Sequence, residues 1–351
     1  MIKKEKIDSA DIARLAGVSR ATVSRVINKK GVVTPETTEK VMKVIQRYAY
    51  TPNLQAQVLA GKHSNTIGLF FTTYSKDIHI NFEDSHMDFI IRMVINAASI
   101  NDYYVLVKTI ADPNAPIAQL QIRDMFVQNR IDAGIFINFP NYCGMIEELI
   151  ASGYIVGLFD HNLSGRNEPN RIIVNMNDKA IVDAVDYLAS LGHKRVMCLH
   201  GDLDRQNGKQ KHDAFRRGAE KHGFYSPPEW QLFTHFSGWS SREVMSRFLK
   251  KTRELPTAIC CANDAIAFGV MDILKEHGIR IPQDISVTGA DDIALSRFVT
   301  PALTTSRVDF YNIFHTLTKK VIDYLEKPFE KPCCTTFSSE FVARDSCCRI
   351  H

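Results

Sequence analysis

The 351-residue chain has 45% hydrophobic residues, 23% charged residues and a net charge of +4. These values are ordinary for a globular protein, and the length exceeds what a single hydrophobic core usually serves, so two or three compact units are expected. The sequence has neither a run of about 18 apolar residues nor a signal-peptide-like start, which argues against a membrane or secreted protein and predicts a cytoplasmic one.

The charge is unevenly distributed along the chain. Residues 1–65 contain 12 Lys or Arg and 5 Asp or Glu, a net charge of +7, whereas the remaining residues carry −3. A small basic unit ahead of a mildly acidic body predicts that the first unit binds a polyanion.

The N-terminal segment has the pattern of a helix-turn-helix. After Ile7, the stretch "DSADIARLAG" offers polar caps, and Gly17 can take the left-handed conformation that ends a helix. Ser19 is a suitable cap for a second helix from Arg20 to about residue 27. The apolar stripe expected on the first helix is formed by Ile12, Ala13, Leu15 and Ala16.

The second helix carries positive charge and hydroxyl groups away from its apolar side. Val23, Val26 and Ile27 are predicted to face inward. The opposite side carries Arg20, Ala21, Thr22, Ser24 and Arg25. A helix can enter the major groove of DNA, where arginine bonds guanine bidentately and short hydroxyls reach phosphate oxygens. The alternative is a solvated helix face, which leaves the glycine turn and the basic charge unexplained.

A third helix and a short segment follow. "TPETTEKVMKVIQRYAY" begins with Thr34 as a cap and Pro35 in the first turn, and its apolar face should close a three-helix core. That face consists of Val41, Val44, Ile45 and Tyr48. The next stretch, "NLQAQVLA", is only two helical turns, too short to be stable alone in water. It is either a linker or a helix that orders on DNA, where Leu59 could wedge into the minor groove.

These motifs resemble those of the LacI/GalR family of bacterial transcription regulators. The resemblance is carried by "VSRATVSRVIN" and by a hinge pattern N-x-x-A-x-x-L, matched by Asn53, Ala56 and Leu59. It covers nearly the whole chain and implies that the first, second and sixth residues of the recognition helix read bases. Those residues are Arg20, Ala21 and Arg25. The resemblance also implies contacts with the DNA backbone from Ser19, Thr22, Ser24, Asn28, Thr34 and Asn53.

The body alternates β-rich runs with helical stretches. The runs are "TIGLFF", "YYVLVKTI", "DAGIFINF", "IVGLFD", "RIIVN", "RVMCLHG", "TAICCAND" and "DISVTGADD", with helices expected at 89–99, 116–128, 178–191 and 208–222. This alternation predicts an α/β fold of parallel sheets covered on both faces, and eight strands suit two doubly wound subdomains.

The predicted domains are a helix-turn-helix domain at 1–50, a hinge helix at 51–64 and an effector-binding and dimerisation body at 65–351. Within the body, an N-subdomain is placed at about 65–160 and 293–322. A C-subdomain is placed at about 161–292 and 323–351.

Polar residues stand at the ends of four predicted strands, where doubly wound folds bind ligands. They are Asp160, Asn175, Asn263 with Asp264, and Asp291 with Asp292. Each one alone is better explained as a helix cap, but the set favours a cleft for a hydroxyl-rich ligand. Phe236 or Trp239 would stack on a sugar ring or a base.

The family resemblance implies a body similar to the periplasmic sugar-binding proteins, with an effector held between two subdomains. Asp160, Phe236, Asn263 and Asp291 match effector-contacting positions, and Thr73 is assigned to the same cleft. Lys211 stands where the family usually has arginine, and Asn175 where aspartate is frequent; both are kept among the expected effector-binding residues. Because lysine cannot form arginine's bidentate fork, an acidic or phosphorylated sugar is an alternative to a neutral one.

No metal or other cofactor is expected. The eight cysteines include three adjacent pairs but no C-x-x-C motif, so we expect reduced structural thiols, with redox sensing as the alternative. His79, Asp84 and His86 lie in a stretch, 72–89, that is longer than in the family, but their spacing is not that of metal ligands. A loop over the cleft is the preferred interpretation.

The sequence therefore predicts a transcriptional repressor controlled by a small effector, a sugar or sugar derivative. The alternatives are a corepressor-dependent repressor or an activator that responds to a purine, a phosphorylated ligand or a protein partner. An enzyme is disfavoured because G-x-S-x-G, H-E-x-x-H and P-loop motifs are missing, and a solute-binding protein because of the basic N-terminal unit. The expected partners are a near-palindromic double-stranded DNA operator, the effector and a second copy in a homodimer, with a tetramer as the alternative and no membrane.

Overall fold

The computed structural model describes residues 7–28, 31–51, 63–72, 85–162, 167–252 and 254–350. The chain divides into two compact units, the head (Met1–Ser64) and the body (Asn65–His351), and each has a hydrophobic core of its own. The predicted hinge at 51–64 falls mostly outside the described residues, so its helix stays a prediction.

The head is a bundle of three short helices, α1 (Ser9–Ala16), α2 (Arg20–Asn28) and α3 (Pro35–Arg47). Gly17 ends α1 with φ +67°, as predicted. The predicted caps are also present, because Ser19 Oγ accepts from Thr22 N at 3.1 Å and Thr34 Oγ1 accepts from Thr37 N at 3.3 Å. The buried core consists of Ile12, Ala13, Val23, Val26 and Val41.

Two residues expected in this core lie outside it. Leu15, at the edge of the stripe on α1, is 42% exposed, and Tyr48 is 41% exposed. Tyr48 follows the last helical residue of α3 and has left the helical conformation, and Tyr50 packs against the core in its place. Helical periodicity therefore predicted which side of each helix faces the core, but it did not predict how far the buried surface extends around or along the helix.

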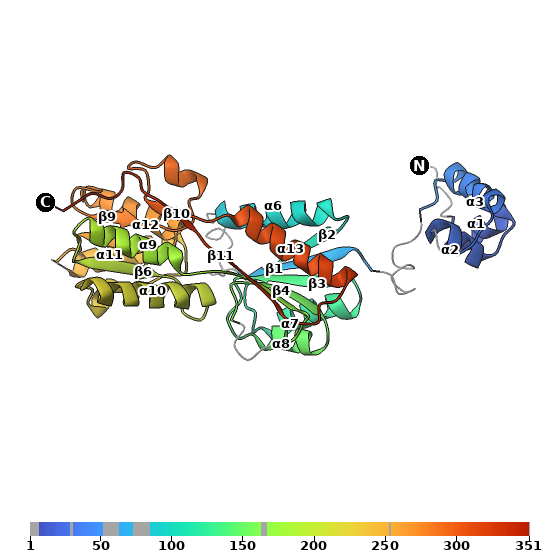
Figure 1. Ribbon diagram of the computed structural model, residues 1–351, viewed down its shortest axis with the longest axis horizontal. Helices are drawn as coiled ribbons and strands as arrows, with labels where there is room; N and C mark the ends of the chain where they lie inside the picture. The colour runs from blue at the N-terminus through green and yellow to red at the C-terminus, as the bar shows by residue number, and fades with distance from the viewer. Residues whose placement is uncertain are drawn as a thin grey trace. The chain divides into compact units, whose positions relative to one another are not determined.

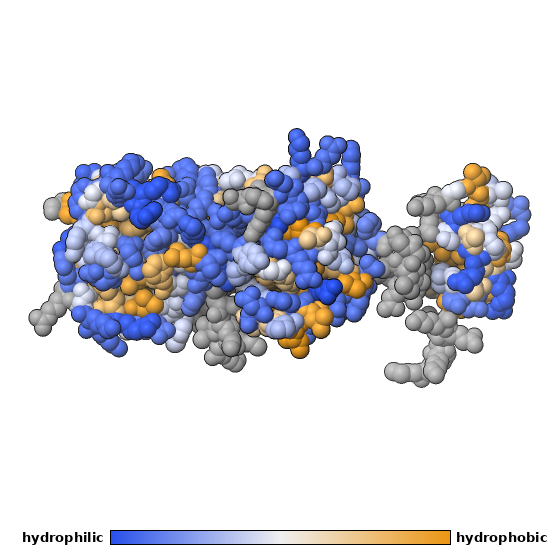
Figure 2. Space-filling view, turned by 90° about the horizontal axis from the view of Figure 1, so that it is seen from below, coloured by the Kyte–Doolittle hydropathy of each residue, from blue (hydrophilic) through white to orange (hydrophobic). Residues whose placement is uncertain are grey.

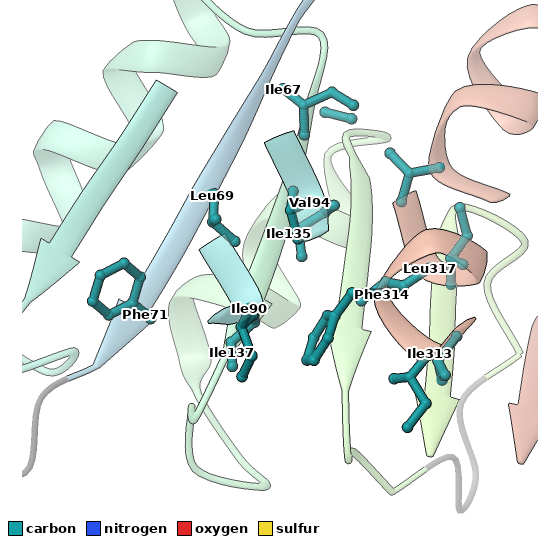
Figure 3. Close-up of a cluster of buried hydrophobic side chains, with 14 of the residues drawn as sticks. Ile67, Leu69, Phe71, Ile90, Val94, Ile135, Ile137, Ile313, Phe314 and Leu317 are labelled. Carbon is teal, nitrogen blue, oxygen red and sulfur yellow. The ribbon is translucent and has the colours of Figure 1, made fainter. Parts of the chain in front are cut away.

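The first sheet of the body has six parallel strands in the order β11-β5-β4-β3-β1-β2. Their bounds are Cys333–Phe337, Arg171–Met176, Ile155–Phe159, Ala133–Ile137, Thr66–Thr72 and Tyr104–Ile110. Helices α6 (Ser85–Ile100) and α13 (Phe310–Glu326) cover one face, and α7 (Pro116–Val127) and α8 (Gly144–Ala151) cover the other (Figure 1). Figure 3 shows side chains of β1 and β3 meeting those of α6 and α13 in this core.

The second sheet has four parallel strands in the order β7-β6-β8-β9. Their bounds are Gln231–Phe233, Val196–His200, Ala258–Cys261 and Ser286–Thr288. Helices α9 (Lys179–Ser190) and α10 (Gln206–His222) pack on one face, and α11 (Gly238–Lys251) and α12 (Asp264–Glu276) on the other. An antiparallel pair, β10 (Thr305–Arg307) and β12 (Glu340–Val342), and two short 3₁₀ helices, Pro228–Trp230 and Ala294–Arg297, complete this subdomain.

The subdomain boundaries differ from those predicted. β5 and β11 belong to the first sheet, although the ranges that contain them, 161–292 and 323–351, are predicted to lie in the second subdomain. Conversely, β10 joins the second subdomain, although 293–322 is predicted to lie in the first. The chain therefore crosses between subdomains after β5, between β10 and α13, and between β11 and β12. An apolar run such as "RIIVN" would suit either sheet, and only its pairing with β4 assigns it.

A buried carboxylate joins segments beside these crossings. Asp292, whose side chain is fully buried, contacts Arg344 at 2.5 Å, Arg307 at 2.9 Å and Arg297 at 3.5 Å. Burial alone would raise its pKa, but the hydrogen bonds from Arg344 and Arg307 outweigh burial and lower the pKa below its ordinary value. This cluster holds the loop after β9 to β10 and to the segment after β12.

The face of the molecule shown in Figure 2 is mainly hydrophilic. On the face shown in Figure 2, hydrophobic residues form separate patches among polar ones. Of the helices that the structure describes, none is both long and apolar enough to cross a bilayer.

Candidate functional sites

The recognition helix α2 presents the predicted residues on its outer side. Arg20, Ala21, Ser24 and Arg25 are exposed, and Thr22 is half-buried. Val23 and Val26 anchor the opposite side of α2 in the head core. Arg20 Nη2 lies 3.4 Å from Ser9 Oγ of α1, so its guanidinium is held near the junction of the two helices. The arrangement offers two guanidinium groups, a methyl group and hydroxyls on one helical surface.

The expected backbone-contacting residues have structural duties too. Ser19 Oγ is hydrogen-bonded to Thr22 Oγ1 at 2.9 Å besides capping α2, and Thr34 Oγ1 donates to Thr37 Oγ1 at 2.9 Å. Each lies at a helix N-terminus, where backbone N–H groups favour an anion such as phosphate. Asn28 belongs to α2, but its side chain is outside the described part of the chain, as are the whole of Asn53, Ala56, Leu59 and Thr73.

The body contains a cavity of about 170 Å³ between its two subdomains. One wall comes from the ends of β3 and β4 and from α6, and the other from α10, α12 and the loops after β7 and β9. Five of the predicted effector residues line it: Asp160, Lys211, Phe236, Asn263 and Asp291. Asp160, Asn263 and Asp291, which were expected from their places at strand ends, are brought together by the fold from distant parts of the sequence.

Asp160 presents an unsatisfied carboxylate oxygen to the cavity. It follows β4 and is 8% exposed, and its Oδ1 accepts from Met176 N at 2.7 Å. Oδ2 is buried, and no donor among the described residues makes a hydrogen bond to it. Burial raises the pKa of Asp160 to about 6, against the opposing effects of the Met176 N–H, the charge of Lys211 and the side chain of Asn207, which lies near enough to the carboxyl group to act on it. A buried acceptor of this kind favours a ligand that donates a hydrogen bond.

Lys211 lies among carboxylates. Its Nζ donates to the carbonyl oxygen of Ala262 at 2.7 Å, and the residue is only 9% exposed. Its charge opposes the burial that raises the pKa values of both Asp160 and Asp291 to about 6. The ammonium therefore acts as a counter-charge for two acids, of which Asp160 is buried and Asp291 half-buried.

Phe236 and Asn263 shape the wall of the second subdomain. The Phe236 ring packs directly on Gly201, where an added Cβ would lie 1.9 Å from ring atom Cζ. Asn263 caps α12 by accepting from Ile266 N at 2.9 Å and donates to the Phe236 carbonyl at 3.1 Å. The Asn263 amide thus holds the aromatic wall as well as the helix, and both of the functions weighed for it, cap and cavity residue, are present.

Several residues of the cavity adopt positive φ without being glycine. Asn138, Asp160 and Phe236 have φ values of +63°, +52° and +57°. Such backbone conformations are uncommon, and costly for a bulky residue such as phenylalanine, and they tend to collect where a binding site needs them. Their concentration at one cavity supports a binding role.

Asn175 and Trp239 do not line the cavity. Both polar atoms of the Asn175 side chain bond the His161 backbone, at 2.9 Å each, so this amide braces the loop that follows β4. Trp239 is 55% exposed on α11. A strand-end amide can thus serve the neighbouring loop instead of a ligand, which periodicity and composition do not reveal.

Other residues of the cavity were not predicted from the sequence. They include Arg205, Asn207, Asn138 and Asn177, and the aromatic rings of Phe139, Phe159, Phe268 and Phe310. Arg205 and Asn207 lie in "GDLDRQNGK", directly after β6. The same strand-end rule, applied to β6, would have found them.

Family models match two parts of the chain. One, described as bacterial regulatory proteins of the lacI family, matches residues 10–53, and a periplasmic binding protein-like domain matches residues 185–347. The chain is 30% identical to the probable HTH-type transcriptional repressor ExuR of Bacillus subtilis, over 97% of this chain and 98% of that protein. It is 31% identical to the HTH-type transcriptional repressor PurR of Haemophilus influenzae, over 84% of each.

Solved structures share the fold. The Lac repressor dimer bound to operator and the anti-inducer ONPF matches with a TM-score of 0.80 and 23% identity, over 97% of this chain and 99% of that one. The complex of the transcriptional regulator CelR with cellobiose matches with a TM-score of 0.72 and 20% identity, over the same shares.

Proposed function

This chain belongs to the lacI family of bacterial regulatory proteins, and we propose that it is a DNA-binding transcriptional repressor controlled by a small effector held in the body cavity. The observation that carries the effector half of this proposal is the buried, unsatisfied Oδ2 of Asp160 in a cavity lined by both subdomains. The DNA-binding half rests on the family and on the exposed face of α2. A repressor of this kind acts on chromosomal DNA in the cytoplasm, and its function involves no catalysis.

In this proposal α2 enters the major groove of the operator. Arg20 and Arg25 bond guanine edges, and Ala21 contacts a thymine methyl group. Ser19, Thr22, Ser24, Asn28 and Thr34 set the position of the helix on the phosphates, together with Asn53. The hinge at 51–64, with Ala56 and Leu59, becomes helical on DNA and Leu59 enters the minor groove.

The proposed effector is a hydroxyl-rich molecule, a sugar or sugar derivative. The carboxylates of Asp160 and Asp291 accept from hydroxyl groups, and the Phe236 ring stacks on the ring of the ligand. Structural neighbours of this chain hold cellobiose and ribose, which supports a carbohydrate. A corepressor such as a purine would use the same acceptors, and binding would then tighten the grip on DNA instead of loosening it.

The proposed assembly is a homodimer on a near-palindromic operator. Four large apolar residues of α6 and the edge strand β2 are exposed: Ile95, Ile100, Tyr104 and Val107. Apolar residues together on one edge favour burial against a second copy. A two-fold dimer places two recognition helices one turn of DNA apart, which favours an inverted-repeat operator.

The test starts from DNA. The full chain selects operators from a random double-stranded library, and the selected DNA is then titrated with protein in the presence of sugars, sugar derivatives and purines. We expect inverted repeats, and one compound class that changes operator affinity by about tenfold or more, as 1–3 kcal/mol of coupling would produce. If no sequence is enriched over random DNA, or if a ligand bound in the cavity leaves operator affinity unchanged, the proposal is wrong.

A further inference from the structure

A lysine and a cysteine meet at one edge of the first sheet. β11 is the edge strand, because it pairs with β5 on one side and stands first in the order of the sheet. Lys320 of α13 directs its Nζ at the Sγ of Cys333 in β11, and the two atoms lie 3.0 Å apart. Both residues are half-buried, and Cys333 packs against the core between the sheet and α13. The pair therefore joins a helix to the edge strand that it covers.

Lys320 differs from its neighbour on α13 in the group that it contacts. The ammonium of Lys319 bonds the carboxylate of Asp323, one turn further along the helix. For Lys320, no carboxylate in the described part of the chain lies within ion-pairing distance of Nζ, and the thiol of Cys333 takes that place. The amine nitrogen and the sulfur are thus direct neighbours, and no acid of the described residues competes for the lysine.

The adjacent Cys334 is the more exposed thiol of the two. Side chains alternate along a strand, so Cys334 points to the opposite face of β11. Its partial burial and the negative charge of Cys333 raise the pKa of Cys334. Because the thiolate is the reactive form, a raised pKa makes Cys334 less reactive than its exposure suggests. Exposure alone would favour oxidation of Cys334, whereas the contact with Lys320 singles out Cys333.

We propose that Lys320 and Cys333 are a redox-modification site, at which one oxygen atom joins Nζ to Sγ in a covalent cross-link. The oxidant is dioxygen, which is small enough to reach a half-buried pair. After the ammonium has lost a proton to solvent, the S–H bond, one N–H bond and the O–O bond break, and an S–O bond and an O–N bond form. The second oxygen atom leaves as water with the two hydrogen atoms.

The electrons of this step balance. Sulfur and nitrogen lose two electrons each, and these four electrons reduce both atoms of dioxygen. An excess of a dithiol reductant returns the four electrons, restores the thiol and the amine, and releases the bridging oxygen as water. The cross-link is therefore reversible, as expected of a site that reports on oxidant.

The cross-link ties together two elements beside the crossings between the subdomains. The chain enters α13 from β10 of the second subdomain, and β11 leads back to β12 of that subdomain. Because Nζ and Sγ are already in contact, the bridge needs only side-chain adjustment. A link of this kind also closes a short loop in the unfolded chain, which favours the folded arrangement of α13 and β11. Oxidation thus becomes a covalent constraint on the segment between two crossings.

The test is mass spectrometry of the full chain. One sample is kept in excess dithiothreitol, and the other is freed of reductant and held in air-saturated buffer. We expect the second sample to gain the mass of one oxygen atom less two hydrogen atoms, located in a cross-linked peptide that contains Lys320 and Cys333. Trypsin should no longer cleave after Lys320 in that sample, and dithiothreitol should reverse both changes.

Substitutions assign the bridge to the pair. Lys320→Arg keeps the positive charge but removes the amine that forms the O–N bond, and Cys333→Ser removes the sulfur, so both should abolish the mass change. Lys319→Arg alters the neighbouring lysine, which bonds an acid, and Cys334→Ser alters the more exposed thiol. These two are the matched controls and should keep the mass change.

Three results overturn the proposal. The air-exposed chain keeps the mass of the reduced chain, oxidation is found on Cys334 or on another of the eight cysteines in place of the Lys320–Cys333 peptide, or the mass change survives in Lys320→Arg. The first two results come from the unsubstituted chain, so they stand whether or not a variant folds.

Discussion

Asp160→Asn should stabilise the body while it removes a contact to the effector. The carboxylate is 8% exposed, and its Oδ2 has no hydrogen-bond donor among the described residues, so in the ligand-free protein its charge opposes folding. Asparagine has nearly the same shape, and its Oδ1 can still accept from Met176 N, which the carboxylate does at 2.7 Å. The substitution thus removes the charge and keeps the backbone contact.

The magnitude follows from the pKa. Raising the pKa of Asp160 from 3.8 to about 6 costs the folded state about 3 kcal/mol once the group is ionised. Since the folded state binds the proton more tightly, this cost is absent below pH 4, develops between pH 4 and pH 6, and is complete above pH 6. Burial of the new amide NH₂ group offsets about 1–2 kcal/mol, so we expect a net gain of about 1–2 kcal/mol at pH 7.5.

The assay is urea unfolding of the full chain without effector at pH 7.5 and pH 4.5. The quantity measured is the free energy of unfolding of the body, taken from its unfolding transition. The variant should be more stable than wild type at pH 7.5, and the advantage should shrink or reverse at pH 4.5. Asp292→Asn is the matched control, because arginines lower the pKa of that buried carboxyl, and it should lose stability at pH 7.5. If Asp160→Asn is destabilising at pH 7.5, or if its effect is independent of pH, the ionised carboxylate does not destabilise the folded body and the reasoning fails.

Three further substitutions test other parts of the molecule. Arg25→Ala should weaken operator binding about 10- to 100-fold in fluorescence anisotropy without changing the helical circular dichroism, and unchanged affinity would remove Arg25 from the base-reading residues. Leu59→Ala should reduce operator bending, measured by energy transfer between DNA ends, more than it reduces nonspecific binding; equal bending would refute the wedge. Gly201→Ala should displace the Phe236 ring and weaken effector binding about tenfold in calorimetry while operator affinity stays at the wild-type value, and full effector affinity would show that the ring takes no part.

The head was predictable in detail because its signals are local. A glycine at the end of α1, hydroxyl caps at Ser19 and Thr34 and valines at helical spacing act over a few residues, and the structure has all of them. The misplaced residues, Leu15 and Tyr48, stand at the margin of a stripe or beyond the end of a helix, where burial depends on which neighbouring helix covers them.

For the body, the sequence by itself determined the α/β class and the eight predicted strands, because alternating helices and β-rich runs imply parallel sheets. It also determined the strand-end residues Asp160, Asn263 and Asp291, because ligands bind at the carboxyl ends of such strands. Only the tertiary structure decided that β5 and β11 extend the first sheet, since pairing partners are distant in sequence and similar apolar runs are interchangeable. The same holds for side chains in and near the cavity: Asn175, outside it, bonds the loop after β4, whereas Lys211 lies near two acids and Arg205 bonds Thr72 across the cleft. Their roles depend on groups that are brought near by folding and are invisible to residue type and spacing.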